Sequence, residues 1–203
     1  MEKFKELPKE KQLPIIDAAL KCFGKYGYKK ASMKDIAQNS GVSKPMLFHY
    51  FGTKKEFYMF LTQYARNVLM EGYKRDKIDS YDDLFERIIV ASEMKMGILE
   101  KSPYLSQFVV SMFMETDSEV AEITNMIRPN AQEFTYGLVV REGDMKKFKE
   151  GVDIKAFIRL IFLMAEGYAY EVSGGKSDFG NVSEEFKKMM LMLKNNLYRE
   201  EYL

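Results

Sequence analysis

The chain has 203 residues, 46% hydrophobic and 30% charged, a composition typical of a globular protein rather than a disordered or fibrous one. Residues 1–10 are charged and lack the apolar segment of a signal peptide, and the most apolar run, 160–165, is far shorter than the ~20 residues of a membrane helix. The single cysteine, Cys22, excludes an internal disulfide framework. We therefore expect a cytoplasmic protein without a membrane association.

The net charge of +1 hides an asymmetry along the chain. Residues 1–60 contain 12 lysines and 6 acidic residues, whereas the remainder contains 19 basic and 24 acidic residues. A basic N-terminal segment on an acidic body suggests that the segment meets a polyanion such as nucleic acid. The alternative is that these lysines only solvate exposed helix faces.

Apolar residues recur at spacings of three and four almost throughout, and strand signals are nearly absent, so the chain is expected to be all-α. The last helices are separated by a loop that runs from Gly174 to Asn181. About nine helices are predicted, at roughly 9–25, 32–40, 43–50, 53–74, 82–99, 103–114, 118–140, 153–172 and 183–199.

Two short helices joined by a tight turn are predicted near the N-terminus. Ser32 and Asp35 form a capping box that starts the first, and Gly41 ends it in a left-handed conformation. Ser43 caps the second, and Pro45 occupies its first turn, where a missing N–H costs nothing. This pattern is typical of a helix-turn-helix, which places its second helix in the major groove of DNA.

A second capping box, Thr53 with Glu56, opens the following long helix. We predict a helix-turn-helix domain over residues 1–52 and a helical ligand-binding and dimerisation domain over 53–203, with the helix from residue 53 as connector. The core of the motif is expected to contain Ile36, Ala37, Val42, Leu47 and Phe51.

The remaining side chains of the motif fall into two groups by position. Those in the first two turns of the second helix that do not face the core can reach base edges, and lysines around the motif can contact phosphates. The candidates for bases are Lys44, Pro45, Met46, His49 and Tyr50, with Ser43 at the helix N-terminus; the candidates for phosphates are Ser32, Lys34, Lys54 and Lys55. For His49 the alternative is an exposed helical residue without a role.

Residues 15–57 resemble the DNA-binding domain of the tetracycline-repressor (TetR) family of bacterial regulators. The matching features are Ala18-Ala19, Phe23, Gly27, Ile36-Ala37, Gly41-Val42-Ser43, Leu47, Tyr50-Phe51 and Lys54. The resemblance implies a variable helical body that binds a small molecule and dimerises through its last two helices. Two positions depart from the family: Phe48 replaces a frequent tyrosine, and Pro45-Met46 replaces Gly-Thr or a similar pair.

Methionines and aromatic residues are abundant in the body and suit a pocket for apolar ligands, although most of them are expected to fill cores. Candidate ligand-binding residues are Met96, Tyr104, Gln107, Phe108, Met112, Phe113, Met126, Tyr136, Phe162 and Tyr168. Glu93, Glu115 and Glu166 are alternatives that favour a cationic ligand, or simply solvated faces.

The last two predicted helices carry apolar residues on several sides. Two such helices from each of two chains would form a four-helix dimer interface. Candidate interface residues are Phe157, Ile161, Met164, Phe186, Met190 and Leu193. The alternative is that these residues pack within one chain.

These observations predict a homodimeric, ligand-responsive regulator that binds a near-palindromic operator in double-stranded DNA. We expect a repressor released by a small apolar or amphipathic effector of unknown identity, with no cofactor and no metal. One alternative is a constitutive DNA-binding or architectural dimer. An enzyme that uses a pocket in the body is the other, but the sequence has no glycine-rich phosphate loop, metal-ligand spacing or nucleophile elbow.

Overall fold

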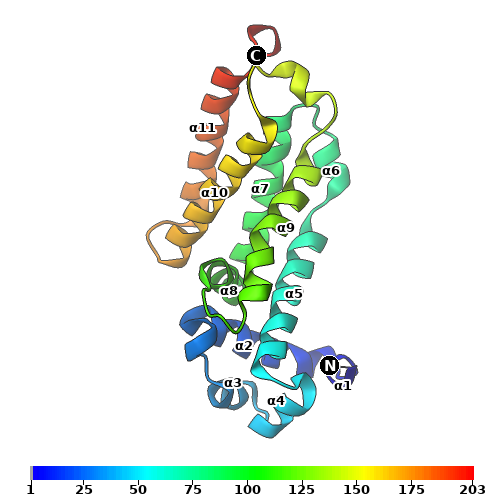
Figure 1. Ribbon diagram of the computed structural model, residues 1–203, viewed down its shortest axis with the longest axis vertical. Helices are drawn as coiled ribbons and strands as arrows, with labels where there is room; N and C mark the ends of the chain where they lie inside the picture. Colours follow the sequence, from blue (N-terminus) through cyan, green and yellow to red (C-terminus); the bar gives the residue numbers. More distant parts are fainter. Residues whose placement is uncertain (1) are drawn as a thin grey trace. The chain divides into compact units, whose positions relative to one another are not determined.

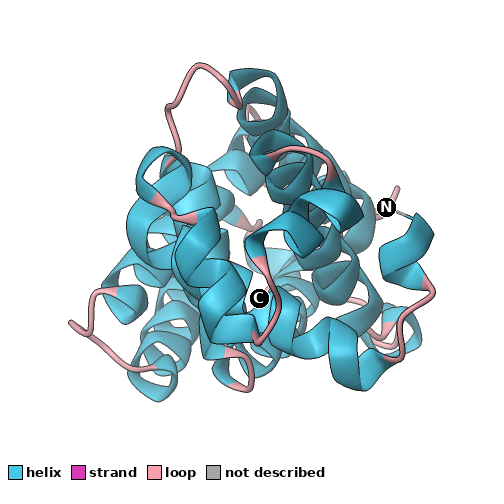
Figure 2. Ribbon diagram, turned by 90° about the horizontal axis from the view of Figure 1, so that it is seen from below, coloured by secondary structure: helices cyan, strands magenta, loops and turns pink. Residues whose placement is uncertain are grey.

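A computed structural model describes residues 2–203, which form helices joined by loops and contain no strand (Figures 1 and 2). The all-α prediction is confirmed. The α-helices are α1 (Glu2–Lys5), α2 (Lys9–Lys30), α3 (Met33–Ser40), α4 (Lys44–Phe51), α5 (Lys54–Gly72), α6 (Arg75–Asp79), α7 (Leu84–Glu100), α8 (Pro103–Met114), α9 (Ala121–Val139), α10 (Ile154–Ser173) and α11 (Phe179–Leu197). The 3₁₀ helices are Asp144–Lys147 and Glu200–Tyr202.

The described helices differ from the prediction at several ends. The short helices α1 and α6 were not predicted, because four or five residues carry no readable periodicity. Asp83, rather than Ser80, caps α7, since its carboxylate accepts the N–H groups of Phe85 and Glu86. Asp178 caps α11 in the same way, so that helix begins before the predicted cap at Ser183. None of the helices in residues 2–203 is long and apolar enough to cross a membrane.

The chain forms two compact units. Unit 1 contains residues 1–70 and 102–128, and unit 2 contains residues 71–101 and 129–203. The predicted division at residues 52 and 53 does not follow these units, because most of α5 and all of α8 belong with the N-terminal helices.

Unit 1 is organised by the close approach of α8 to α2. Gly24 of α2 lies against the α8 backbone: a Cβ atom at this position would be 2.9 Å from the amide nitrogen of Phe108. The next turn of α2 is broken at Gly27, which has a φ of 69°. The N–H of Tyr28, freed by this break, donates to the Glu115 carboxylate at 2.6 Å, just beyond the end of α8. Backbone proximity and this hydrogen bond therefore fix α8 on α2.

Unit 2 has its own apolar core, built mainly from α7, α10 and α11, to which Ile78 of α6 and Leu138 and Val139 of α9 also belong. One buried ion pair crosses the unit: Arg87 on α7 donates to both carboxylate oxygens of Asp144 at 2.6 Å. The guanidinium also donates to the carbonyls of Val139 and Tyr81. Since removing one partner leaves a buried charge unpaired, this pair specifies how the loop around residue 144 closes on α7.

Gly24→Ala tests the packing of α8 on α2. The added methyl group collides with backbone atoms that cannot move independently, so we expect the free energy of unfolding to fall by about 1–3 kcal/mol. Gly97→Ala is the matched control, because Gly97 lies inside α7 with no atom near its missing Cβ; it should leave stability unchanged or raise it by up to about 1 kcal/mol. Urea unfolding measures both, and equal values for the two variants would contradict the packing described.

Candidate DNA-binding surface and a cavity in unit 2

The turn between α3 and α4 has the predicted caps. The Ser32 hydroxyl accepts the Asp35 N–H at 3.2 Å, and Gly41 ends α3 with a left-handed φ of 73°. The Ser43 hydroxyl accepts the N–H of Met46 at 3.3 Å and starts α4. These local bonds set the turn, so the direction of α4 follows directly from residues 32–46.

The start of α5 is also capped as predicted. The Glu56 carboxylate accepts both the hydroxyl and the N–H of Thr53 at 2.8 Å, and the Thr53 hydroxyl accepts the Glu56 N–H at 3.1 Å. The two bonds to the carboxylate hold the pKa of Glu56 below its ordinary value. Gly52 precedes this box with a φ of 78° and allows the chain to turn from α4 into α5.

Aromatic rings hold α4 from beneath. Leu47 is fully buried, and the Phe51 ring stacks on Phe57 of α5 with centroids 3.8 Å apart. Phe51 also contacts Phe4 of α1 at 4.6 Å and Phe60 of α5 at 5.2 Å. Helix α4 is therefore anchored on both α1 and α5 through one side chain.

The opposite side of α4 is open to solvent. The predicted base-contacting residues Lys44, Pro45, Met46 and His49 are exposed there, together with Ser43 at the N-terminus. Tyr50 is half-buried, since its ring packs edge-on against Phe4 at 5.8 Å. Tyr50 is therefore the least accessible of these candidates.

The predicted phosphate contacts are placed unevenly. Lys34 is exposed, and Ser32 retains its hydroxyl hydrogen for a second partner. Lys54 turns back to donate to the carbonyl of Lys29 at 3.2 Å, with its ammonium 4.8 Å from the Tyr28 ring centroid. Lys55 is half-exposed. Lys54 thus links α5 to the end of α2, and one of the three donors of its ammonium is used within unit 1.

One exposed residue of α4 was missed as a candidate. Phe48 is 38% exposed, and the Lys44 ammonium lies 5.8 Å from its ring centroid. The spacing of four residues on a helix would have signalled this pair. Phe48 and Lys44 together form an apolar and cationic strip along the outer face.

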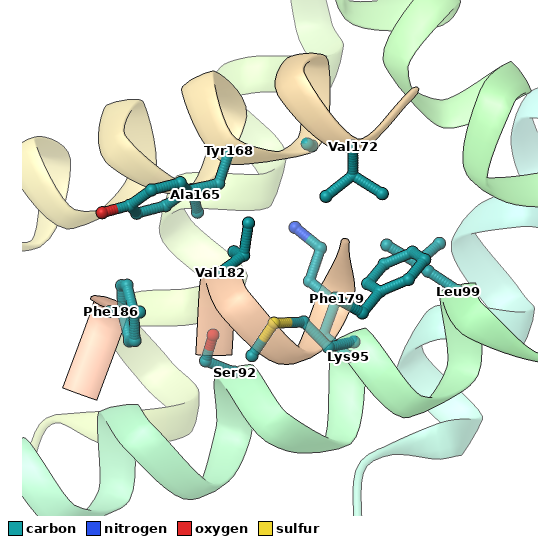
Figure 3. A pocket seen from close by; sticks show the side chains of 11 residues that line it. Ser92, Lys95, Leu99, Ala165, Tyr168, Val172, Phe179, Val182 and Phe186 are labelled. Carbon is teal, nitrogen blue, oxygen red and sulfur yellow. The ribbon is translucent and has the colours of Figure 1, made fainter. Parts of the chain in front are cut away.

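A small cavity of about 50 Å³ lies within unit 2, between α7, α10 and α11 (Figure 3). Its walls are mainly apolar, and Figure 3 shows Lys95 reaching from α7 among them. Removal of the ammonium from water lowers the pKa of Lys95, an effect opposed by the charge of Glu166. The lining residues are Ser92, Lys95, Met96, Leu99, Ala165, Tyr168, Ala169, Val172, Phe179, Val182 and Phe186.

Only two of the ten predicted ligand-binding residues, Met96 and Tyr168, line this cavity. Phe108 and Met112 are buried in unit 1, where the Phe108 ring meets Tyr58 at 5.5 Å. The others are outside the lining: Tyr104, Gln107, Phe113 and Met126 belong to unit 1, and Tyr136 and Phe162 to unit 2. Composition alone pointed to an aromatic and methionine-rich region, and it missed Lys95 because a lysine seldom lines an apolar wall.

The predicted dimer residues point mostly inward. Phe157, Ile161, Phe186 and Met190 are buried in the core of unit 2, so they are unavailable to a second chain. The half-buried side chains of Met164 and Leu193 pack against the same core. The alternative of packing within one chain holds for these positions. Other large apolar residues of α10 and α11 are exposed instead, namely Leu160, Leu163, Tyr170, Leu191 and Met192.

Known proteins resemble both the N-terminal helices and the whole fold. The family profile described as "Bacterial regulatory proteins, tetR family" matches residues 15–58. The transcriptional activator FasR of Mycolicibacterium smegmatis is 26% identical over 137 residues, which cover 68% of this chain and 62% of FasR. The aligned stretch thus spans less than two thirds of that relative.

Two crystal structures show the same fold. A TetR-family regulator from Chloroflexus aurantiacus superposes with a TM-score of 0.73 at 17% identity, covering 98% of this chain and 99% of that one. FadR of Bacillus subtilis, in complex with stearoyl-CoA, gives 0.71 at 18% identity, covering 88% and 96%. Taken with the capped helix-turn-helix, the matched profile identifies residues 15–58 as a domain of the tetR family of bacterial regulatory proteins, and the two crystal structures show that the chain shares their fold.

Proposed function

We propose that this protein is a dimeric transcription regulator that binds operator DNA through α4 and responds to a small acyl compound. The observation that carries the DNA-binding part is the outer face of α4. Lys44, Met46 and His49 are exposed on a helix whose inner face is fixed by Leu47 and Phe51. A rigid helix with a free polar face, in a segment with a large excess of lysine, suits the major groove.

The proposed contacts are of two kinds, those to the DNA backbone and those to base edges. The N-terminus of α4 would present the N–H of Lys44 and the positive end of the helix dipole to a phosphate beside Ser43, since Pro45 has no N–H and the Met46 N–H donates to the Ser43 hydroxyl. Lys44 can donate to guanine O6 and N7, and Met46 can contact a thymine methyl group. Lys34 supplies a phosphate contact that fixes register without reading sequence.

Lys44→Ala tests this proposal. Loss of a groove-facing ammonium should weaken binding to a duplex selected from a random pool by about tenfold. It should also lower the salt slope by about one for each head, meaning α1 to α4 with the start of α5. The matched control is Lys146→Ala, which removes an exposed lysine from unit 2. Fluorescence anisotropy over a range of salt concentrations measures both quantities. If Lys44→Ala binds like the parent protein, α4 is not the reading helix.

A dimer would be formed through the outer faces of α10 and α11. On α10, Ala156, Leu160, Leu163, Gly167 and Tyr170 are all exposed and follow spacings of four and three residues. This heptad-like spacing is typical of a seam between paired helices. On α11, Leu191 and Met192 are 60% and 55% exposed. A second copy of the chain would bury both stripes and bring two heads to a near-palindromic operator.

Leu163→Glu tests the seam. A carboxylate placed in an apolar interface is desolvated without a partner, so the variant should be monomeric at concentrations where the parent is a dimer. Glu171→Lys on the same helix is the control, since it changes an exposed side chain outside the stripe. Light scattering after gel filtration gives the molecular mass. A dimeric Leu163→Glu variant would contradict this interface.

The effector is proposed to act on unit 2 through the cavity between α7, α10 and α11. Support for an acyl compound comes from the mainly apolar walls and from the fold shared with the stearoyl-CoA complex of FadR. A cavity of about 50 Å³ is far smaller than the ~300 Å³ or more of a complete ligand site. An acyl chain would therefore have to part α10 and α11 from α7.

This requirement suggests how control operates. Because α10 and α11 carry the proposed dimer seam, parting them from α7 would change how two copies pair and how far apart their heads lie. An effector that binds only the state with α10 and α11 parted from α7 increases the population of that state, and so decreases the population that binds DNA. The same linkage would produce activation if the parted state held the heads at the operator spacing.

Ala169→Leu tests the effector site. The larger side chain fills the cavity, so DNA binding without effector should be unchanged while the concentration of dodecanoyl-CoA needed for half-response rises about tenfold. Ser173→Leu is the control, because it adds the same apolar bulk at an exposed position of α10. DNA anisotropy under titration with dodecanoyl-CoA provides the readout. An unchanged response in Ala169→Leu would place the effector elsewhere.

A further inference from the structure

The short helix α1 is fixed against α4. Phe4 is fully buried, and its ring contacts those of Tyr50 and Phe51 on α4 at 5.8 Å and 4.6 Å, and that of Phe60 on α5 at 5.3 Å. Four residues cannot form a stable helix alone, so this burial supplies the order of α1. The N-terminal segment is therefore part of the folded head.

A second tether fixes the other end of α1. The side-chain amide of Gln12, in the first turns of α2, donates to the carbonyl of Leu7 at 2.6 Å and to that of Lys5 at 3.2 Å. These bonds satisfy the carbonyls that α1 leaves free where the chain enters α2. With one end held by Phe4 and the other by Gln12, α1 has little freedom to turn.

This arrangement brings Lys3 to the outer face of α4. The Lys3 ammonium lies 3.4 Å from Nε2 of His49, and both residues are exposed. A neutral His49 ring can accept one hydrogen, which leaves the ammonium with donors for another partner. Overall, the α1 segment is not basic, because Glu2 and Glu6 balance Lys3 and Lys5. A DNA contact by α1 would therefore depend on the position of Lys3 and not on the net charge of the α1 segment.

We propose that α1 is a further DNA-contacting element, in which Lys3 binds a backbone phosphate at the edge of the groove that α4 occupies. The inference rests on the proposed DNA binding through α4. Because α1 is ordered in advance, the contact requires little further loss of conformational entropy. A phosphate contact adds affinity on every sequence and fixes the register of α4 without reading bases.

Lys3→Ala tests this inference, with Lys5→Ala as matched control. The two lysines carry the same charge on the same helix, but residues two apart do not share a helix face. Lys3→Ala should lower affinity several-fold on all duplexes alike and reduce the salt slope by about one per head, whereas Lys5→Ala should change affinity less than twofold. Anisotropy titrations on a selected duplex and on a scrambled duplex measure the effect.

Two further measurements distinguish a phosphate contact of Lys3 from a role of Lys3 in the stability of the fold. Lys3→Arg should retain the salt slope, since it keeps the charge in place, and Lys3→Ala should unfold at the same urea concentration as the parent. If Lys3→Ala leaves affinity and slope unchanged while Lys44→Ala reduces both, the role of α1 is overturned and DNA binding through α4 stands. If neither variant changes binding, the proposed function itself fails.

Discussion

The ring of Phe51 is the contact on which the head depends. It stacks on Phe57 at 3.8 Å and touches Phe4 and Phe60, so three helices meet at one side chain. Gly52 makes this stack possible, because its φ of 78° turns the chain sharply between α4 and α5 and so brings Phe57 onto Phe51. With its inner face held this way, α4 can present polar groups outward without losing its direction.

In unit 2, helix α10 is apolar on two faces. On α10 one face carries Phe157 and Ile161 into the core, while another carries Leu160 and Leu163 to the surface. A helix that is apolar on both faces needs two partners, of which the chain supplies one. This imbalance is the physical reason for proposing a second copy. The proposed effector site and the proposed subunit contact then involve the same two helices, α10 and α11.

Local features were predictable from sequence, whereas long-range ones were not. The caps at Ser32, Ser43 and Thr53 each involve residues three positions apart, so their chemistry can be read directly. The docking of α8 depends on Gly24, and nothing near that glycine in sequence indicates its neighbour. On α10, an all-round apolar pattern contains no information about which face turns inward, which is why the predicted interface residues include Phe157 and Ile161 of the core.

Photo-cross-linking tests the central claim, that the outer face of α4 reads DNA. A benzoylphenylalanine would replace either Met46 on α4 or Met145 in unit 2, both of which are exposed. With a selected duplex, position 46 should cross-link to bases within each half-site, and position 145 should give no DNA adduct. Adducts from position 145 but none from position 46 would contradict the account.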